Sequence, residues 1–222
     1  MHQVRYAMPP SRIGADLRAM LSAVGPGDDV LGGVALLGLS LPGLNLVIDA
    51  VLVLPRGLIV VSGVDLPGPA LRLEAPNNGP WLVDGWRLVR PGSPTGGALA
   101  AASAVGARLQ APAAPALPLS AVVAVGPYVR EVVQPNGDAP VVLHPTPRQL
   151  VRMAARLARA PHPCDVATAG ALLARLAPGN GVTPEILAAE GFVTHRVVNN
   201  RRQQGLDRGQ GLNREFGPGG RW

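Results

Sequence analysis

Residues 46–68 read LVIDAVLVLPRGLIVVSGVDLPG, and this stretch decides the fold. Two apolar runs rich in β-branched residues flank Pro55, Arg56 and Gly57. Such a pattern predicts a β-hairpin with its turn at the proline and glycine. One acid, Asp49, lies in the middle of the first run, where a charged side chain is unusual. Asp49 is therefore the first candidate functional residue.

The register of this hairpin depends on the length of its loop. A two-residue loop pairs Leu54 with Gly57. Asp49 then lies opposite Ser62 on the same face, with Cβ atoms about 5 Å apart. Gly57 can instead form a bulge after a type I turn, which shifts the pairing by one residue and turns Ser62 away from Asp49. The sequence leaves both registers open.

The stretch resembles the core of the nuclease-related domain, a branch of the restriction-endonuclease-like superfamily. That family shows an acid in an apolar strand, a short turn with proline and glycine, and then a strand with Glu-x-Lys and a later glycine. The chain matches this pattern at Ile48, Asp49, Pro55, Gly57 and Gly68. Ser62 stands at the glutamate position and Val64 at the lysine position. The resemblance implies an α/β fold with a restriction-endonuclease-like mixed β-sheet flanked by helices.

The resemblance also implies what the chemistry requires. Nucleases of this superfamily use carboxylates to hold a divalent metal and a lysine to orient or activate water, and Mg²⁺ needs one or two carboxylates beside waters and phosphate. All 20 basic residues of this chain are arginine, so it contains no lysine. We therefore expect a catalytically degenerate domain without a cofactor. It would act as a binding or structural module for nucleic acid or a protein.

The alternative is an active nuclease that holds Mg²⁺ or Mn²⁺ through Asp49 and Asp16, with Ser62 as a weaker ligand. Asp16 resembles a displaced form of the acid that opens an early helix in this family. Equally, Asp16 can be an acid that the helix dipole favours near a helix start. The family often places glutamine three residues after a proline at a later helix, but Gly97 follows Pro94 at that spacing here.

Length and composition limit the class of protein to which the chain can belong. A chain of 222 residues with 47% apolar content favours one α/β domain. We expect no signal peptide, and glycine, proline and Asp49 break the apolar region 30–64 into pieces too short for a transmembrane helix. Cys164 is the only cysteine, which excludes an intrachain disulfide and suits a cytoplasmic location. We interpret it as a small buried residue at the start of a helix.

We predict four segments along the chain. Residues 1–10 form an irregular lead-in, 11–160 the nuclease-related α/β domain, 161–198 a helical extension packed on it, and 199–222 an arginine-rich disordered tail. The predicted helices are one that Ser11 caps, then 97–109, 146–159, 165–176 and a short one after Thr183. The predicted strands are 30–41, the hairpin, 70–74, 81–89 and 119–125, with a second hairpin formed by 128–133 and 141–143.

Trp81 and Trp86 form an aromatic pair that can serve as core or as a platform for bases. Aromatic residues make up only 3% of the chain, so we interpret the pair as core packing.

Arginines supply the expected nucleic-acid contacts. Six follow Phe192 and give that end +4 of the net charge of +6. Others recur at helical spacing within 146–159. A solvated helix face and a solubilising tail are the plain alternatives. The residues that we predict to contact nucleic acid are Arg148, Arg152, Arg201, Arg202 and Arg208. The oligomeric state stays open.

Overall fold

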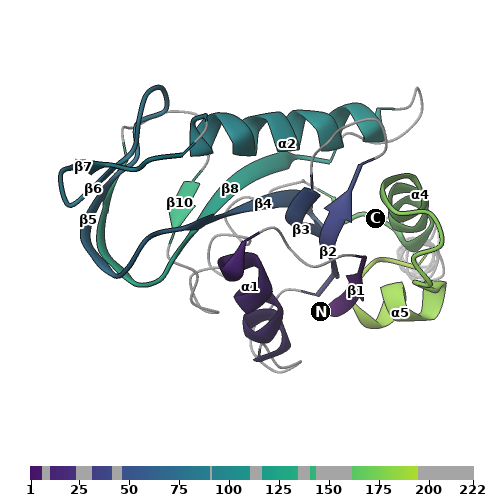
Figure 1. The fold of residues 1–222 in the computed structure, drawn as a ribbon. Helices are drawn as coiled ribbons and strands as arrows, with labels where there is room; N and C mark the ends of the chain where they lie inside the picture. The colour runs from purple at the N-terminus through teal and green to yellow at the C-terminus, as the bar shows by residue number, and fades with distance from the viewer. Residues whose placement is uncertain are drawn as a thin grey trace, which may run out of the picture.

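The computed structural model describes residues 1–6, 11–23, 32–41, 47–90, 92–110, 117–134, 141–143 and 162–194. These residues form an α/β protein with two mixed sheets flanked by helices (Figure 1). The strands are β1 (His2–Arg5), β2 (Val34–Ser40), β3 (Val47–Leu54), β4 (Gly57–Asp65), β5 (Ala70–Glu74), β6 (Leu82–Val83), β7 (Trp86–Arg87), β8 (Leu119–Gly126), β9 (Val129–Val133) and β10 (Val141–Leu143). The described helices are α1 (Arg12–Ala23), α2 (Pro94–Leu109), α4 (Val166–Leu176) and α5 (Pro184–Ala189).

The larger sheet has the order β1-β2-β3-β4-β8-β10. Strands β2, β3 and β4 are antiparallel neighbours, while β8 lies parallel to β4 and to β10. The β3–β4 loop contains two residues, because Leu54 pairs with Gly57 and Ala50 with Val61. Of the two registers that the sequence left open, the chain therefore adopts the one with the two-residue loop.

The smaller sheet, here called the distal sheet, has the order β7-β6-β5-β9. The chain connects it directly to the larger sheet, because β5 follows β4 and β9 follows β8 in the sequence. Asp65 pairs with Gly126 at the end of the larger sheet, and Ala70 pairs with Val129 in the distal sheet. In Figure 1 these two segments run side by side and carry the distal sheet to the end of the molecule beside α2. The predicted strand 70–74 is confirmed.

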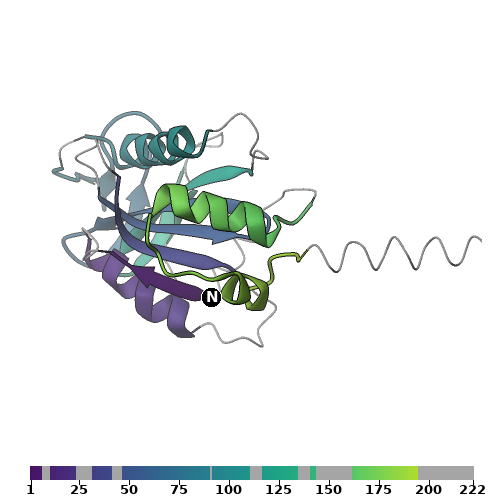
Figure 2. The same cartoon turned by 90° about the vertical axis from the view of Figure 1, so that its right-hand side faces the viewer.

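Helices cover both faces of the larger sheet (Figure 2). On one face Ile13 and Leu17 of α1 pack in an apolar cluster with Ile59 of β4. On the other face α2, α4 and α5 share a second cluster with β2, β3 and β4. The larger sheet is therefore buried on both faces, which explains the unbroken apolar runs of β4 and β8.

Local capping signals set where the helices begin. The Ser11 Oγ accepts a hydrogen bond from the Gly14 N–H at 2.9 Å at the start of α1. Asp165 caps α4 by accepting from the Thr168 N–H, and Thr183 caps α5. The predictions of these three helices are confirmed.

Four predictions of local structure are wrong. Residues 81–89 do not form one strand, because a turn at Asp84 and Gly85, which both have positive φ, divides them into the antiparallel strands β6 and β7. Residues 1–10 include β1, which pairs in parallel with β2 and so depends on a distant partner. The segments 128–133 and 141–143 do not form a hairpin, because β9 pairs with β5 and β10 pairs with β8. Helix α2 begins at Pro94 rather than at residue 97, since Ser93 caps it and proline suits the first helical position.

Some predictions lie outside the described residues. These are the helix 146–159, the turn at 135–140 and the tail 199–222. None of the described helices is long and apolar enough to cross a membrane.

Candidate functional site

The backbone around Asp49 departs from a regular strand. Gly38 stands across from Asp49, but these two residues are not a ladder pair in the described strands β2 and β3. Gly38 has a φ of 63°, which glycine adopts without strain. Ile48 belongs to the cluster under α2 and α4, whereas Ala50 belongs to the cluster under α1. Regular alternation would place both on one face, so the side-chain direction changes at Asp49.

Asp49 is buried, with 3% of its surface exposed. Its Oδ1 accepts a hydrogen bond from the Ser11 Oγ at 2.6 Å and another from the Ser11 N–H at 3.2 Å. Its Oδ2 accepts from the Gly63 N–H at 2.7 Å. Both carboxyl oxygens therefore bind protein donors, and they join the start of α1 to β3 and β4.

Asp65 holds the same helix start from β4. Its two oxygens accept from the Arg12 N–H at 2.9 Å and the Ile13 N–H at 3.1 Å. The first N–H groups of a helix lack partners within the helix, and negative charge is favourable beside them. We call Ser11, Asp49 and Asp65 the helix clamp. Sequence reasoning missed Asp65; the signal was its spacing of two from Gly63, which places both on one face.

Ser62 and Val64 face away from the helix clamp. A Cβ on Gly63 would overlap the Ser11 Oγ, so Gly63 faces α1 and its neighbours in β4 face the other side. Val64 is 2% exposed and packs in the apolar cluster of Trp81. The two-residue loop was expected to place Ser62 and Asp49 on one face, and this expectation is wrong although the strands have that register. The change of direction at Asp49 is the reason.

The two acids proposed as metal ligands differ in burial. Asp16 is exposed on α1, whereas Asp49 is buried at the helix start. The described part of the chain contains no group of three or more His, Cys, Asp or Glu side chains that could hold a metal ion.

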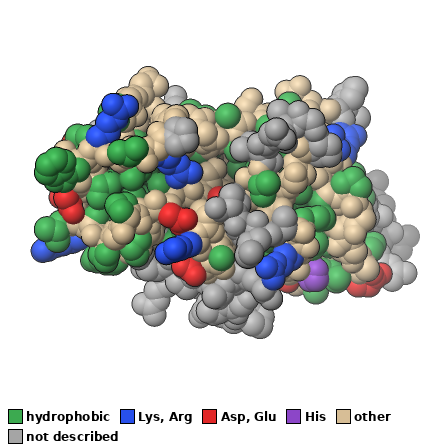
Figure 3. Space-filling view, viewed as in Figure 1, with side chains coloured by type: hydrophobic (Ala, Val, Ile, Leu, Met, Phe, Trp, Pro, Cys, Tyr) green, Lys and Arg blue, Asp and Glu red, His purple; other side chains and the backbone are tan. Residues whose placement is uncertain are grey.

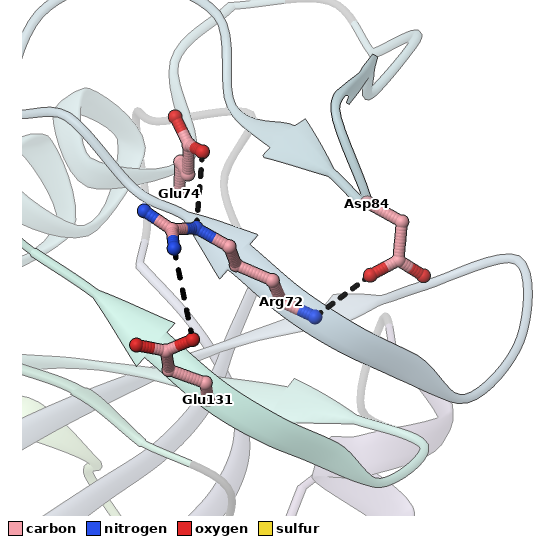
Figure 4. A network of polar contacts seen from close by, with 4 residues as sticks. All are labelled: Arg72, Glu74, Asp84 and Glu131. Atoms are coloured by element: carbon pink, nitrogen blue, oxygen red, sulfur yellow. Dashed lines mark hydrogen bonds and ion pairs between the residues drawn. The ribbon is translucent and has the colours of Figure 1, made fainter.

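The acids of the distal sheet surround Arg72 (Figure 4). The Arg72 guanidinium forms ion pairs with Glu74 at 3.1 Å and with Glu131 at 3.8 Å. Asp84 accepts a hydrogen bond from the Arg72 N–H at 2.7 Å. These acids are therefore engaged within the distal sheet.

The two tryptophans of the distal sheet differ in burial. Trp81 is 1% exposed and packs in the core, as predicted, but Trp86 is 81% exposed. The core interpretation is wrong for Trp86, because β7 is an edge strand of two residues whose side chains are exposed. Leu71, Val89 and Tyr128 are further exposed apolar residues in this part of the chain. Figure 3 shows hydrophobic side chains gathered on the end of the molecule that the distal sheet forms.

Cys164 is buried just before α4, as expected for a small structural residue. Burial raises the pKa of its thiol to about 11, and the charge of Asp165 acts in the same direction. A thiol with a raised pKa is a poor nucleophile at neutral pH. The position of Cys164 does not suit covalent catalysis.

The predicted nucleic-acid contacts Arg148, Arg152, Arg201, Arg202 and Arg208 lie outside the described residues, so they stay predictions. No protein-family model, curated protein or solved structure matches the chain.

Proposed function

We propose that the chain is a catalytically degenerate nuclease-related domain that acts as a binding or structural module. The observation that carries this proposal is the use of Asp49. This acid, which the family uses for a metal, here accepts hydrogen bonds from Ser11 and Gly63 with both oxygens. A metal at Asp49 would compete with these donors in a buried place, where an unpaired N–H or O–H is costly.

The other catalytic positions support the same proposal. Val64, at the lysine position, is buried among apolar side chains, and the chain contains no lysine elsewhere. Ser62, at the glutamate position, is a neutral group on the opposite face from the helix clamp. Activation of water by a carboxylate and an ammonium group therefore has no counterpart at these positions.

Nucleic acid is the partner that the charge distribution favours. The chain has a net charge of +6, and proteins that bind nucleic acid attract phosphates with arginine and lysine. Within the distal sheet, Arg72 forms ion pairs with Glu74 and Glu131. Arg87 forms no ion pair with an acid among the described residues.

A plasmid-nicking assay tests the catalytic part of the proposal. Wild-type protein, D49N and D16N are incubated with supercoiled plasmid in Mg²⁺, in Mn²⁺ and in a chelator. We expect no metal-dependent nicking above the level of the chelator control. Nicking by the wild type that disappears in D49N and D16N would instead support the active nuclease built on Asp49 and Asp16. Asparagine is chosen because it keeps the shape of the acid and one carbonyl acceptor.

A further inference from the structure

A pocket of about 300 Å³ lies between the β6–β7 hairpin and the start of α2. Its lining includes Trp81, Arg87, Arg90, Ser93 and Pro94. The lining residues that the structure describes include no acid. The pocket therefore carries a formal charge of +2 from its two arginines.

Several groups of this pocket suit an anion. Arg87 and Arg90 are exposed and have no acidic partner in the described part of the chain. Ser93 caps α2 and Pro94 is the first residue of this helix of 16 residues, whose N-terminus carries a partial positive charge that favours anions. Trp81 adds a buried indole N–H that has no acceptor among the described residues.

A second hollow, of about 630 Å³, adjoins the first and shares Arg87 and Leu88 with it. Trp86 and Val89 line this second hollow and are 81% and 95% exposed. An exposed indole offers a face on which any base can stack.

Two acids, Asp65 and Asp84, also line the second hollow. They accept hydrogen bonds from the backbone N–H groups of α1 and of Arg72. Their negative charge disfavours a phosphate there. The two hollows therefore separate by chemistry: the Arg90 side suits a phosphate, and the Trp86 side suits a base.

We infer that the two hollows together bind one nucleotide unit of a single-stranded nucleic acid. Its phosphate lies against Arg87, Arg90 and the start of α2, and its base stacks on Trp86. The inference rests on the nucleic-acid part of the proposed function and names the surface that binds the strand. It assigns no role in this binding to the helix clamp.

The test measures binding of a fluorescently labelled single-stranded oligothymidylate by anisotropy, with the full chain in chelator and at several salt concentrations. We expect the double variant R87Q/R90Q to bind at least about tenfold more weakly. The slope of log K against log salt should become shallower by about 0.7, because the two arginines neutralise one phosphate and each neutralised phosphate of a single strand contributes about 0.7. W86A should weaken binding at least about fivefold without changing that slope.

Arg130 provides the matched control. It is exposed on β9, at the opposite edge of the distal sheet from β7, so R130Q removes one arginine charge outside both hollows, against two in the double variant. We expect R130Q to bind like the wild type. Equal weakening per charge removed by R130Q and by the double variant would show general charge attraction and overturn the inference.

Competition with inorganic phosphate separates the two sources of a phosphate group. We expect millimolar phosphate to displace the oligonucleotide only weakly, because the oligonucleotide binds far more tightly. This result supports a nucleic-acid strand as the ligand. Binding of phosphate alone, without oligonucleotide binding, would overturn the inference. The binding assay contains a chelator, so metal-dependent cleavage does not affect it. A positive nicking assay would therefore contradict the proposed loss of catalysis and leave the measured oligonucleotide binding unchanged.

Discussion

The hydroxyl of Ser11 donates a hydrogen bond to Asp49 across 2.6 Å, although 38 residues separate them. This contact places the buried acid of residues 46–68 at the start of the first helix. The same Oγ accepts from the Gly14 N–H, so Ser11 links the buried acid to the first turn of α1. An acid that a sequence pattern marks for catalysis is thus used to hold two elements together.

Replacement of Asp49 by alanine should destabilise the fold. D49A leaves the Ser11 hydroxyl and the Gly63 N–H without their acceptor inside the protein. Each such donor costs about 1–3 kcal/mol, so we expect the free energy of unfolding in urea to fall by at least about 2 kcal/mol. D16A, on the exposed face of the same helix, should stay within about 0.5 kcal/mol of the wild type. A D49A variant as stable as D16A would contradict the structural role of Asp49.

Introduction of a side chain at Gly63 should separate α1 from the sheet. A Cβ there would overlap the Ser11 Oγ and lie 2.5 Å from the Ile13 Cγ2. We expect G63A to lower the free energy of unfolding by about 1–3 kcal/mol, as overpacking does. At Gly68 a Cβ would meet nothing within 4 Å, so G68A is the control. Similar melting temperatures for the two variants would contradict the close approach.

Introduction of a lysine at Val64, where the nuclease-related pattern has one, should not produce a stable active site. V64K places an ammonium group where Val64 is 2% exposed beside Trp81 and Ala98. Burial can lower a lysine pKa by about three units, which costs on the order of 4 kcal/mol at neutral pH. L71K is the control, because Leu71 is 68% exposed, and it should change stability by less than about 0.5 kcal/mol. A stable V64K variant that nicks plasmid with Mg²⁺ would contradict this prediction, because it would show that Asp49 can still hold a metal.

The thiol of Cys164 should resist alkylation in the folded protein. Burial raises its pKa from 9.0 to about 11, so the thiolate fraction at pH 8 is about a hundredfold lower than for an ordinary thiol. We expect iodoacetamide to react at least about a hundredfold faster after unfolding in urea. The unfolded thiol ionises before the folded one as the pH rises. The contribution of the protonated Cys164 thiol to the free energy of unfolding is therefore present below pH 9 and is lost between pH 9 and about 11. In C164A that pH dependence should be smaller.

Deletion of residues 199–222 should weaken DNA binding and flatten its salt dependence. This segment carries five arginines and two acids, and each arginine that contacts a duplex phosphate adds about 0.9 to the salt slope. Anisotropy with a labelled duplex at several salt concentrations measures both effects. Equal binding by the full and shortened chains would show that these arginines do not contact DNA.

Local patterns predicted most of the described elements. The apolar runs on both sides of Pro55 and Gly57 predicted the hairpin, and Ser11, Asp165 and Thr183 marked three helix starts. These succeed because turns and caps form between residues close in sequence. The edge strand β1 and the partners of β9 and β10 were not predicted, because strand pairing with distant segments leaves no local signal.

The sequence by itself determined that the chain has no lysine, that Asp49 lies in an apolar strand, and that β3 and β4 meet through a two-residue turn or a bulge. Only the tertiary structure decided that the acid turns toward Ser11 while Ser62 and Val64 face the other side of the sheet. The physical reason is that the change of direction at Asp49 depends on Gly38 in β2 and on donors from α1, and neither lies within the hairpin. The exposure of Trp86 was decided in the same way, by the position of β7 at the edge of the distal sheet.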